Sequence, residues 1–230
     1  MGNVVKLNKN MDQHLKYTRF LDSFPKVNAG SLLISLLCVI LMVAATFTLI
    51  PAGLYDAKMF FEPQNYFSNF NNIILTLHSY LYCPQIPIAL FAGALLGPRL
   101  GSFTMIVYVA LGLLGVPVFA GGGGVSYIFE PVFGFIAGYI LSAYLVGKIL
   151  SNKINSFNII FAVLTGVFTI HVTGLTYLIT DMYIAGTPVA TIKAWVIGLS
   201  LENLPYDIIF GLILCSLARP VRGLLWFAID

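Results

Sequence analysis

Two carboxylates near the C-terminus stand beside a long apolar run. Glu202 and Asp207 belong to the stretch Leu201-Glu202-Asn203-Leu204-Pro205-Tyr206-Asp207. Ionisable groups close to hydrocarbon are costly and usually face a polar cavity. If Pro205 lies in the first turn of a helix, Asp207 lies in the same turn, where the helix dipole favours a carboxylate. Two interpretations remain open: a ligand-binding carboxylate, or a helix-start residue in contact with interfacial water.

The glycine-rich segment from Ala120 to Gly124 is a second candidate, with Tyr127 shortly after it. Glycine permits close backbone approach and positive φ. Such a loop can fold over a cavity mouth, where Gly122 and Gly123 would offer backbone amides and Tyr127 would stack on a ligand. The segment lacks the Lys-Ser/Thr ending of a phosphate-binding loop. The alternative interpretation is a flexible exterior linker.

Gln85 and Tyr206 complete the candidate substrate-binding residues, although Gln85 could equally be an interfacial hydrogen-bonding residue. His171 lies among threonines in an apolar run, and a lone histidine there is more often a helix–helix hydrogen bonder than a proton relay. The sequence shows no nucleophile–base constellation, zinc spacing or nucleotide fingerprint, and its three cysteines form no metal-ligand or disulfide pattern. We therefore expect no enzyme activity, no metal site and no cofactor.

The composition places these residues in a membrane. Of the 230 residues, 59% are hydrophobic and 9% are charged, whereas soluble domains carry about 25% charged residues. A helix needs roughly 20 apolar residues to span a bilayer. We expect an all-α membrane protein with six transmembrane helices, over approximately 32–50, 85–96, 102–116, 133–146, 159–180 and 205 to just before 219.

The positive charges predict the orientation of these helices. With the N-terminus inside the cell, ten of the twelve Lys and Arg residues fall on cytosolic segments, and only Lys58 and Lys193 fall outside. Both termini are then cytosolic. The acidic residues of the membrane region, including Asp207, fall toward the outer face, which is a weaker orientation signal than Lys and Arg and bears on where a site could lie. We expect a cytosolic N-terminal arm over 1–30, a transmembrane domain over 31–219 and a cytosolic tail over 220–230.

Several stretches are similar to motifs of a known family. They are Ala92-Gly93-Ala94-Leu95-Leu96-Gly97-Pro98-Arg99-Leu100-Gly101, then Tyr108, and then Gly115-Val116-Pro117-Val118-Phe119-Ala120-Gly121-Gly122. More loosely, Leu204-Pro205-Tyr206-Asp207 looks like that family's Leu-Pro-Gly-Asp. By these residues the chain resembles the BioY family, the biotin-capture subunits of energy-coupling factor (ECF) transporters.

The resemblance implies a six-helix, multi-pass protein of the bacterial inner membrane that binds biotin or an analogue in an outward-facing pocket beneath its exterior loops. It implies that Asp207 accepts hydrogen bonds from the ureido nitrogens of the ligand, and a cyclic urea with two N–H donors does suit a carboxylate. Gln85 matches a family glutamine. The implied partners are membrane lipid, an ECF coupling subunit and cytosolic ATPases, with no nucleic acid.

The chain also departs from the family pattern. Gly122 stands where relatives can have an asparagine, and Phe210 stands where the family often has lysine. The first apolar run lacks the Ala-x-x-x-Ala spacing by which such subunits dock, and Ser31 and Ser35 are the nearest small pair. Small residues at that spacing let helix backbones approach closely.

Three functional hypotheses follow. The first is uptake of biotin as the substrate-binding subunit of an ECF-type transporter. The second is a capture subunit or facilitator of the same fold for a different vitamin-like molecule. The third is a scaffold or an enzyme using Asp207, Glu202 and His171, which would require those three side chains within hydrogen-bond reach. Convergence of Gln85, Tyr127 and Asp207 under the glycine loop would favour capture.

Overall fold

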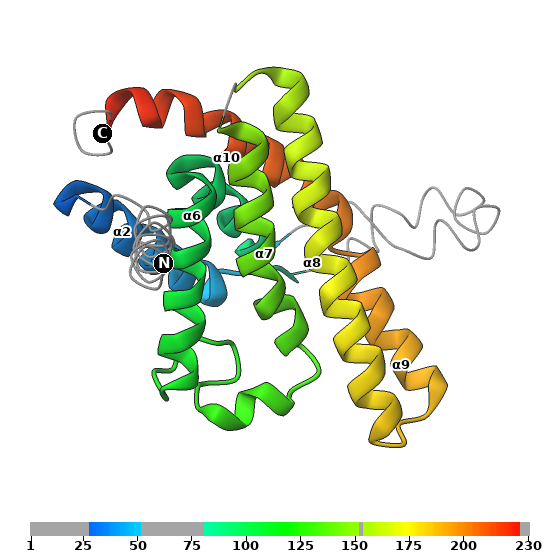
Figure 1. Ribbon diagram of the computed structural model, residues 1–230. Helices are drawn as coiled ribbons and strands as arrows, with labels where there is room; N and C mark the ends of the chain where they lie inside the picture. The colour runs from blue at the N-terminus through cyan, green and yellow to red at the C-terminus, as the bar shows by residue number, and fades with distance from the viewer. Residues whose placement is uncertain (1–27, 52–80, 152–153, 226–230) are drawn as a thin grey trace, which may run out of the picture.

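The computed structural model describes residues 28–51, 81–151 and 154–225. Most of the expected N-terminal arm and of the first exterior loop therefore lies outside the described residues. The α-helices, labelled in Figure 1, are α2 (Ala29–Phe47), α6 (Gln85–Leu113), α7 (Phe133–Leu150), α8 (Ser156–Ile184), α9 (Val189–Val196) and α10 (Leu204–Leu224). Two shorter helical segments are η1 (Val125–Phe129) and η2 (Ile197–Leu201). Two short strands, β1 (Ile50–Pro51) and β2 (Leu81–Tyr82), pair antiparallel.

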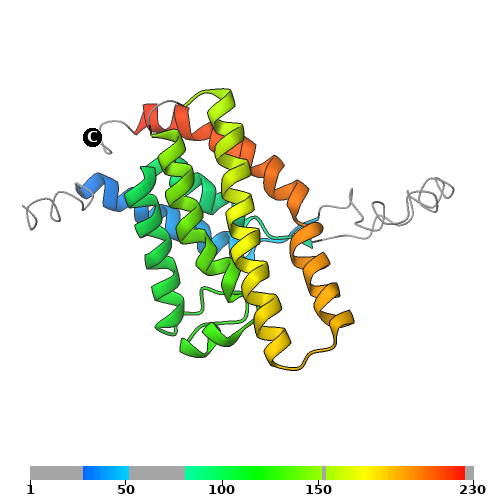
Figure 2. The same cartoon turned by 45° about the vertical axis from the view of Figure 1, so that its right-hand side comes forward.

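The helices form one bundle. The helix α7 packs against both α6 and α8, and α2 and α10 pack against α6. In Figure 2, α2 and α10 run obliquely across the upright helices α7 and α8. Among the described residues, five helices are long and apolar enough to cross a membrane, with α9 through α10 counted as one. The all-helical expectation is confirmed, and two of the six expected runs are joined within α6.

The first helix begins and ends earlier than the run of apolar residues suggested. Asn28 caps α2 by accepting a hydrogen bond from the Ser31 amide at 2.6 Å, and the Ser31 hydroxyl accepts one from the Asn28 amide at 3.1 Å. This reciprocal capping box satisfies two otherwise unpaired donors. The helix ends at Phe47, and the expected end at Ile50 is wrong because Ile50 pairs with Tyr82 in the two-stranded sheet.

The helix α6 reverses direction at Gly97. That residue has φ 80° and ψ −179°, a conformation open essentially to glycine alone. A Cβ on Gly101 would lie 2.8 Å from the Cα of Gly93, whereas eight residues of straight helix span about 12 Å. The element is therefore a tight hairpin of two helical arms, and the expected turn at Gly97-Pro98-Arg99 is confirmed as a break in the helix.

The later helices extend beyond their apolar runs. The helix α7 ends at Leu150, α8 covers 29 residues, and α10 continues to Leu224; the expectation that the last helix stops before Arg219 is wrong. A 29-residue helix is about 43 Å long, more than the hydrocarbon thickness of about 30 Å. The helix α8 therefore extends beyond its apolar residues. Its first residue follows the polar Asn155, whose side chain caps the helix by accepting a hydrogen bond from the Asn158 amide at 2.7 Å.

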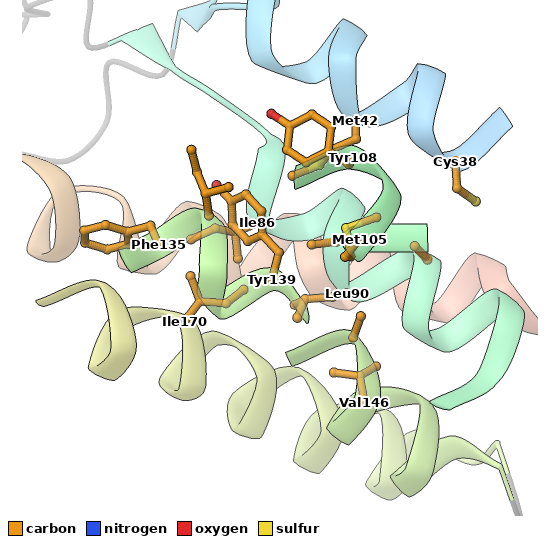
Figure 3. Packing of buried hydrophobic residues seen from close by; sticks show 14 of the residues in the cluster. Cys38, Met42, Ile86, Leu90, Met105, Tyr108, Phe135, Tyr139, Val146 and Ile170 are labelled. Carbon is orange, nitrogen blue, oxygen red and sulfur yellow. The ribbon is translucent and has the colours of Figure 1, made fainter. Parts of the chain in front are cut away.

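The core lies where α2, α6, α7 and α8 meet. Figure 3 shows Met42 of α2 beside Tyr108 of α6, and Leu90, Val146 and Ile170 deeper between the helices. Close helix contacts are made by small residues: a Cβ on Gly93 would lie 2.3 Å from the carbonyl oxygen of Ala143. This close packing fixes the first arm of α6 against α7 and so sets the walls of the site.

Candidate functional site

A cavity of about 220 Å³ lies among the first turns of α6, α7 and α10 and the loop that follows α6. Three of its lining side chains, Ile86, Phe135 and Tyr139, appear in Figure 3. The lining is mostly apolar with a few polar groups, as is usual for small-molecule sites. The lining residues are Cys83, Gln85, Ile86, Ala120, Tyr127, Val132, Phe135, Ile136, Tyr139, Leu199, Asn203 and Asp207.

Asp207 is the charged residue of this cavity. It lies in the first turn of α10, as its position after Pro205 predicts, and it is 1% exposed. Its Oδ1 accepts a hydrogen bond from the Tyr82 hydroxyl at 2.7 Å, and its Oδ2 lies 3.0 Å from Nε2 of His171. The interpretation of Asp207 as a residue in contact with interfacial water is wrong, because it is buried and hydrogen-bonded on both oxygens.

Tyr82 reaches Asp207 from β2 and is completely buried. Its ring stacks on Phe210, with centroids 5.4 Å apart and planes 12° from parallel, and it lies 5.4 Å from the ring of Tyr206. Burial, followed by the charge of Asp207, raises the pKa of Tyr82. Tyr82 therefore remains a phenol and donates to the carboxylate.

His171 continues the same chain of polar contacts. It is a buried residue of α8, and its Nδ1 lies 2.8 Å from the Ser200 hydroxyl in η2. The ring of Phe135 meets it edge-on, with centroids 6.0 Å apart. The interpretation of His171 as a helix–helix hydrogen bonder is confirmed, and its partner on α10 is the carboxylate of the site.

Gln85 belongs to a second polar group on the cavity wall. Its Nε2 donates to the Thr46 hydroxyl at 2.7 Å, and its Oε1 accepts from the Tyr139 hydroxyl at 2.8 Å. The Thr46 hydroxyl also lies 3.1 Å from that of Tyr108, which donates to the carbonyl of Val118 at 3.2 Å. This network connects α2, α6, α7 and the loop after α6, which contains Val118, around one end of the cavity.

The glycine-rich segment is a tied turn. Phe119 and Gly122 exchange two backbone hydrogen bonds, of 3.0 and 2.9 Å, and the Gly124 amide donates to the Gly112 carbonyl at 2.7 Å. Gly122 has φ 111°, which favours glycine. The amides of Gly122 and Gly124 are thus used within the protein, and the interpretation of the segment as a flexible linker is wrong.

The turn positions Tyr127 at the cavity. Its ring packs on Phe119 with centroids 4.6 Å apart, and burial raises the pKa of its phenol, against the effect of a hydrogen bond with the Gly121 backbone. A Cβ on Gly123 would lie 2.4 Å from the Val116 carbonyl oxygen, so the loop can pack this closely only with glycine at that position.

The structure brings three of the six candidate residues together on one cavity: Asp207, Gln85 and Tyr127. Gly122, Gly123 and Tyr206 lie outside the lining set, the glycines in the turn that precedes Tyr127 and Tyr206 against the ring of Tyr82. Sequence reasoning missed Tyr82, Tyr139 and Ser200, which carry no signal in spacing or periodicity. His171 did carry a signal, because a histidine in an apolar helix needs a polar partner.

Within the described residues, no group of three His, Cys, Asp or Glu side chains is placed to hold a metal ion. The fold and the cavity define a helical membrane protein with a buried, mainly apolar pocket that holds one carboxylate, the arrangement of a small-molecule binding site.

Comparison with known proteins gives the family. The BioY family model matches residues 70–226. A probable biotin transporter BioY of Lysinibacillus sphaericus is 41% identical over 68 residues, which are 30% of this chain and 35% of that protein. The biotin transporter BioY of Rhizobium etli is 30% identical over 143 residues, which are 57% of this chain and 72% of that protein. The chain belongs to the BioY family.

A solved structure shares the fold. The crystal structure of the S-component for biotin from an ECF-type ABC transporter superposes with a TM-score of 0.59 at 22% identity, covering 84% of this chain and 90% of that one. The match to the Lysinibacillus relative, and a second to a Pyrococcus horikoshii protein, span only 35% and 40% of those relatives' own length. The chain's relatives are named transporters, in line with the expectation of a protein that is not an enzyme.

Proposed function

We propose that this protein takes up biotin across the cell membrane, as the substrate-binding subunit of an ECF-type transporter. The observation that carries the proposal is the buried Asp207 on a mostly apolar cavity, in a chain of the BioY family. Biotin combines an apolar bicycle with a ureido group, and such a cavity offers apolar walls and one strong acceptor. Relatives named biotin transporters support this choice of ligand.

In this proposal Asp207 accepts hydrogen bonds from the ureido nitrogens. Gln85, which is hydrogen-bonded to Thr46 and Tyr139 on the cavity wall, contributes its side-chain amide. Tyr127, which follows the glycine-rich turn, covers the ligand. Gly122 and Gly123 act by shaping the turn that precedes Tyr127, and Tyr206 acts by packing on Tyr82. Charge-assisted hydrogen bonds are the strong ones, so Asp207 makes the largest polar contribution to affinity.

The proposed topology has six passes, cytosolic termini and an outward-facing pocket in a bacterial inner membrane. Support comes from the hairpin of α6, whose two arms run in opposite directions around Gly97. The guanidinium of Arg222 lies near Gly97, and Nε of Arg222 donates to the Leu95 carbonyl at 2.7 Å. Lys148, in the last turn of α7, lies one residue from Gly147, which packs against Gly97 and Pro98. Positive charges thus gather at the α6 turn, and the pocket lies at the first turns of the same helices.

Membrane lipid, an ECF coupling subunit and two cytosolic ATPases are the proposed partners. The Ser31 and Ser35 pair is buried against the bundle, at 2% and 7% exposure. The exposed face of α2 instead carries leucine and isoleucine side chains, including Leu33, Leu36 and Ile40. Docking of α2 onto a coupling subunit would therefore use bulky apolar residues.

Calorimetry with purified full-length protein tests the ligand. Wild type is expected to bind biotin, and Asp207→Asn to lose affinity by about 10-fold to 100-fold, since hydrogen bonds to a charged group contribute about 1.5–3 kcal/mol. Asp181→Asn in α8, outside the cavity lining, is the matched control. Absence of binding at micromolar biotin contradicts the proposal. Stabilisation by another vitamin in a thermal-shift screen would then favour the same fold with a different ligand.

A further inference from the structure

Four side chains from four segments form one chain of hydrogen bonds that passes through the carboxylate of the cavity. Ser200 of η2 contacts Nδ1 of His171, Nε2 of His171 contacts Asp207, and Tyr82 of β2 contacts the other oxygen of Asp207. The three distances are 2.8, 3.0 and 2.7 Å. All four residues are buried, and of them Asp207 lines the cavity.

The position of each proton follows from the donors and acceptors. Within the described residues, the hydroxyl of Ser200 has His171 Nδ1 as its hydrogen-bond partner. A buried hydroxyl that donates to no acceptor is costly, so Ser200 donates to Nδ1. A neutral imidazole has one donor and one acceptor nitrogen. If Nδ1 accepts, Nε2 carries the hydrogen and donates to Asp207.

Asp207 is then an acceptor on both oxygens. Tyr82 donates to Oδ1 and His171 donates to Oδ2. An ionised carboxylate has about four lone-pair sites, and two of them are used by the protein. Because Asp207 lines the cavity, a carboxylate held in this way suits a ligand with two neighbouring N–H donors.

We propose that His171, Tyr82 and Ser200 are positioning residues that hold Asp207 as an acceptor-only carboxylate, so that the site selects a ligand presenting two adjacent N–H groups. The inference rests on the proposed function and names the side chains that give that site its selectivity. Ser200 acts through His171, and His171 and Tyr82 act through Asp207. A ligand presenting an acceptor to Asp207 meets another acceptor there.

Binding by two variants of His171 separates positioning from simple packing. His171→Leu removes the donor and is expected to weaken biotin binding about 10-fold to 100-fold. His171→Gln keeps an N–H at a similar reach and is expected to stay within about 5-fold of wild type. Equal losses in the two variants, or no loss in either, overturn the positioning role.

A measurement without ligand keeps the inference testable if variants fold poorly. The chain has three histidines, so ¹⁵N-histidine protein carrying His14→Gln and His78→Gln reports on His171 alone. We expect the hydrogen on Nε2, and a mixture of tautomers in Ser200→Ala. A hydrogen on Nδ1 in the protein with Ser200 intact, or on both nitrogens, overturns the inference.

The two proposals can fail separately. If the Nε2 tautomer is found but biotin does not bind to wild type, the biotin assignment fails and the positioning of Asp207 stands. If biotin binds to wild type but His171→Leu binds it equally well, the positioning role fails and the biotin assignment stands.

Discussion

The hydroxyl of Tyr82 lies 2.7 Å from Asp207, although 125 positions separate the two residues in the sequence. Tyr82 lies on strand β2 next to the first turn of α10, where its ring packs against the rings of Phe210 and Tyr206. A buried carboxylate is stable only with such partners. Tyr82 therefore links the structure before α6 with the last helix.

Tyr82→Phe is the sharpest test of this contact. The ring and its stacking on Phe210 remain and only the hydroxyl is lost, so we expect about a 10-fold loss in biotin affinity with a modest loss in thermal stability. Isothermal titration calorimetry and a thermal-shift assay measure the two. Tyr144→Phe, at an exposed position on α7, is the control and should change neither. Unchanged affinity in Tyr82→Phe would mean that Asp207 needs no donor from β2.

Gln85→Leu should disturb both binding and folding. It leaves the Tyr139 hydroxyl without its acceptor, and a buried unsatisfied polar group costs about 1–3 kcal/mol. The Thr46 hydroxyl loses its contact with the Gln85 amide but still donates to the Met42 carbonyl. We expect weaker biotin binding and a lower unfolding temperature in detergent. The double variant Thr46→Val with Gln85→Leu should lose less than the sum of the two single changes, because the partners are removed together. Strict additivity would contradict the network.

Gly97→Ala should destabilise the α6 hairpin. At φ 80° and ψ −179°, an L-residue other than glycine carries strain of about 1–3 kcal/mol. Gly223→Ala is the matched control, because it lies within α10 and a Cβ there meets no atom within 4 Å; replacing a helical glycine gains about 0.5–1 kcal/mol. Chemical unfolding in detergent gives both values. Equal stability of the two variants would argue against a strained turn.

Cys83 should report occupancy of the pocket. Its thiol lines the cavity and contacts the carbonyl of Ala45 at 3.1 Å, while Cys38 and Cys215 are buried in the bundle. Burial, outweighing a backbone contact at Gln85, raises the pKa of Cys83. A thiol with a raised pKa holds less thiolate at neutral pH, so labelling by a small thiosulfonate should be slow and should speed up as the pH rises.

Biotin should protect Cys83 from that reagent. Mass spectrometry after labelling gives the modified fraction at each cysteine, and Cys38 and Cys215 serve as internal controls. Loss of protection in Asp207→Asn would tie the effect to the proposed site. Equal labelling with and without biotin would place the ligand elsewhere.

The sequence by itself determined the class of protein and the residue at the centre of the site. A chain with 9% charged residues must bury its helices in a membrane, because so few charges cannot cover a soluble surface. In such a chain each charge within an apolar run is conspicuous, and Asp207 could be singled out for that reason. The turn at Gly97 could also be predicted from the local sequence, because glycine and proline interrupt a helix through their own backbone conformations.

The tertiary structure alone decided what surrounds Asp207. Tyr82 lies in a stretch without helical or strand periodicity. Ser200 stands between two leucines, and nothing in the local sequence indicates a hydrogen-bond partner for it. Their pairing depends on how β2, η2 and α8 meet α10, which is a matter of long-range packing. The glycine-rich segment shows the same limit, since its amides could have faced a ligand or the chain itself. The structure ties Gly122 to Phe119 and Gly124 to Gly112 because buried amides must find acceptors wherever the fold supplies them.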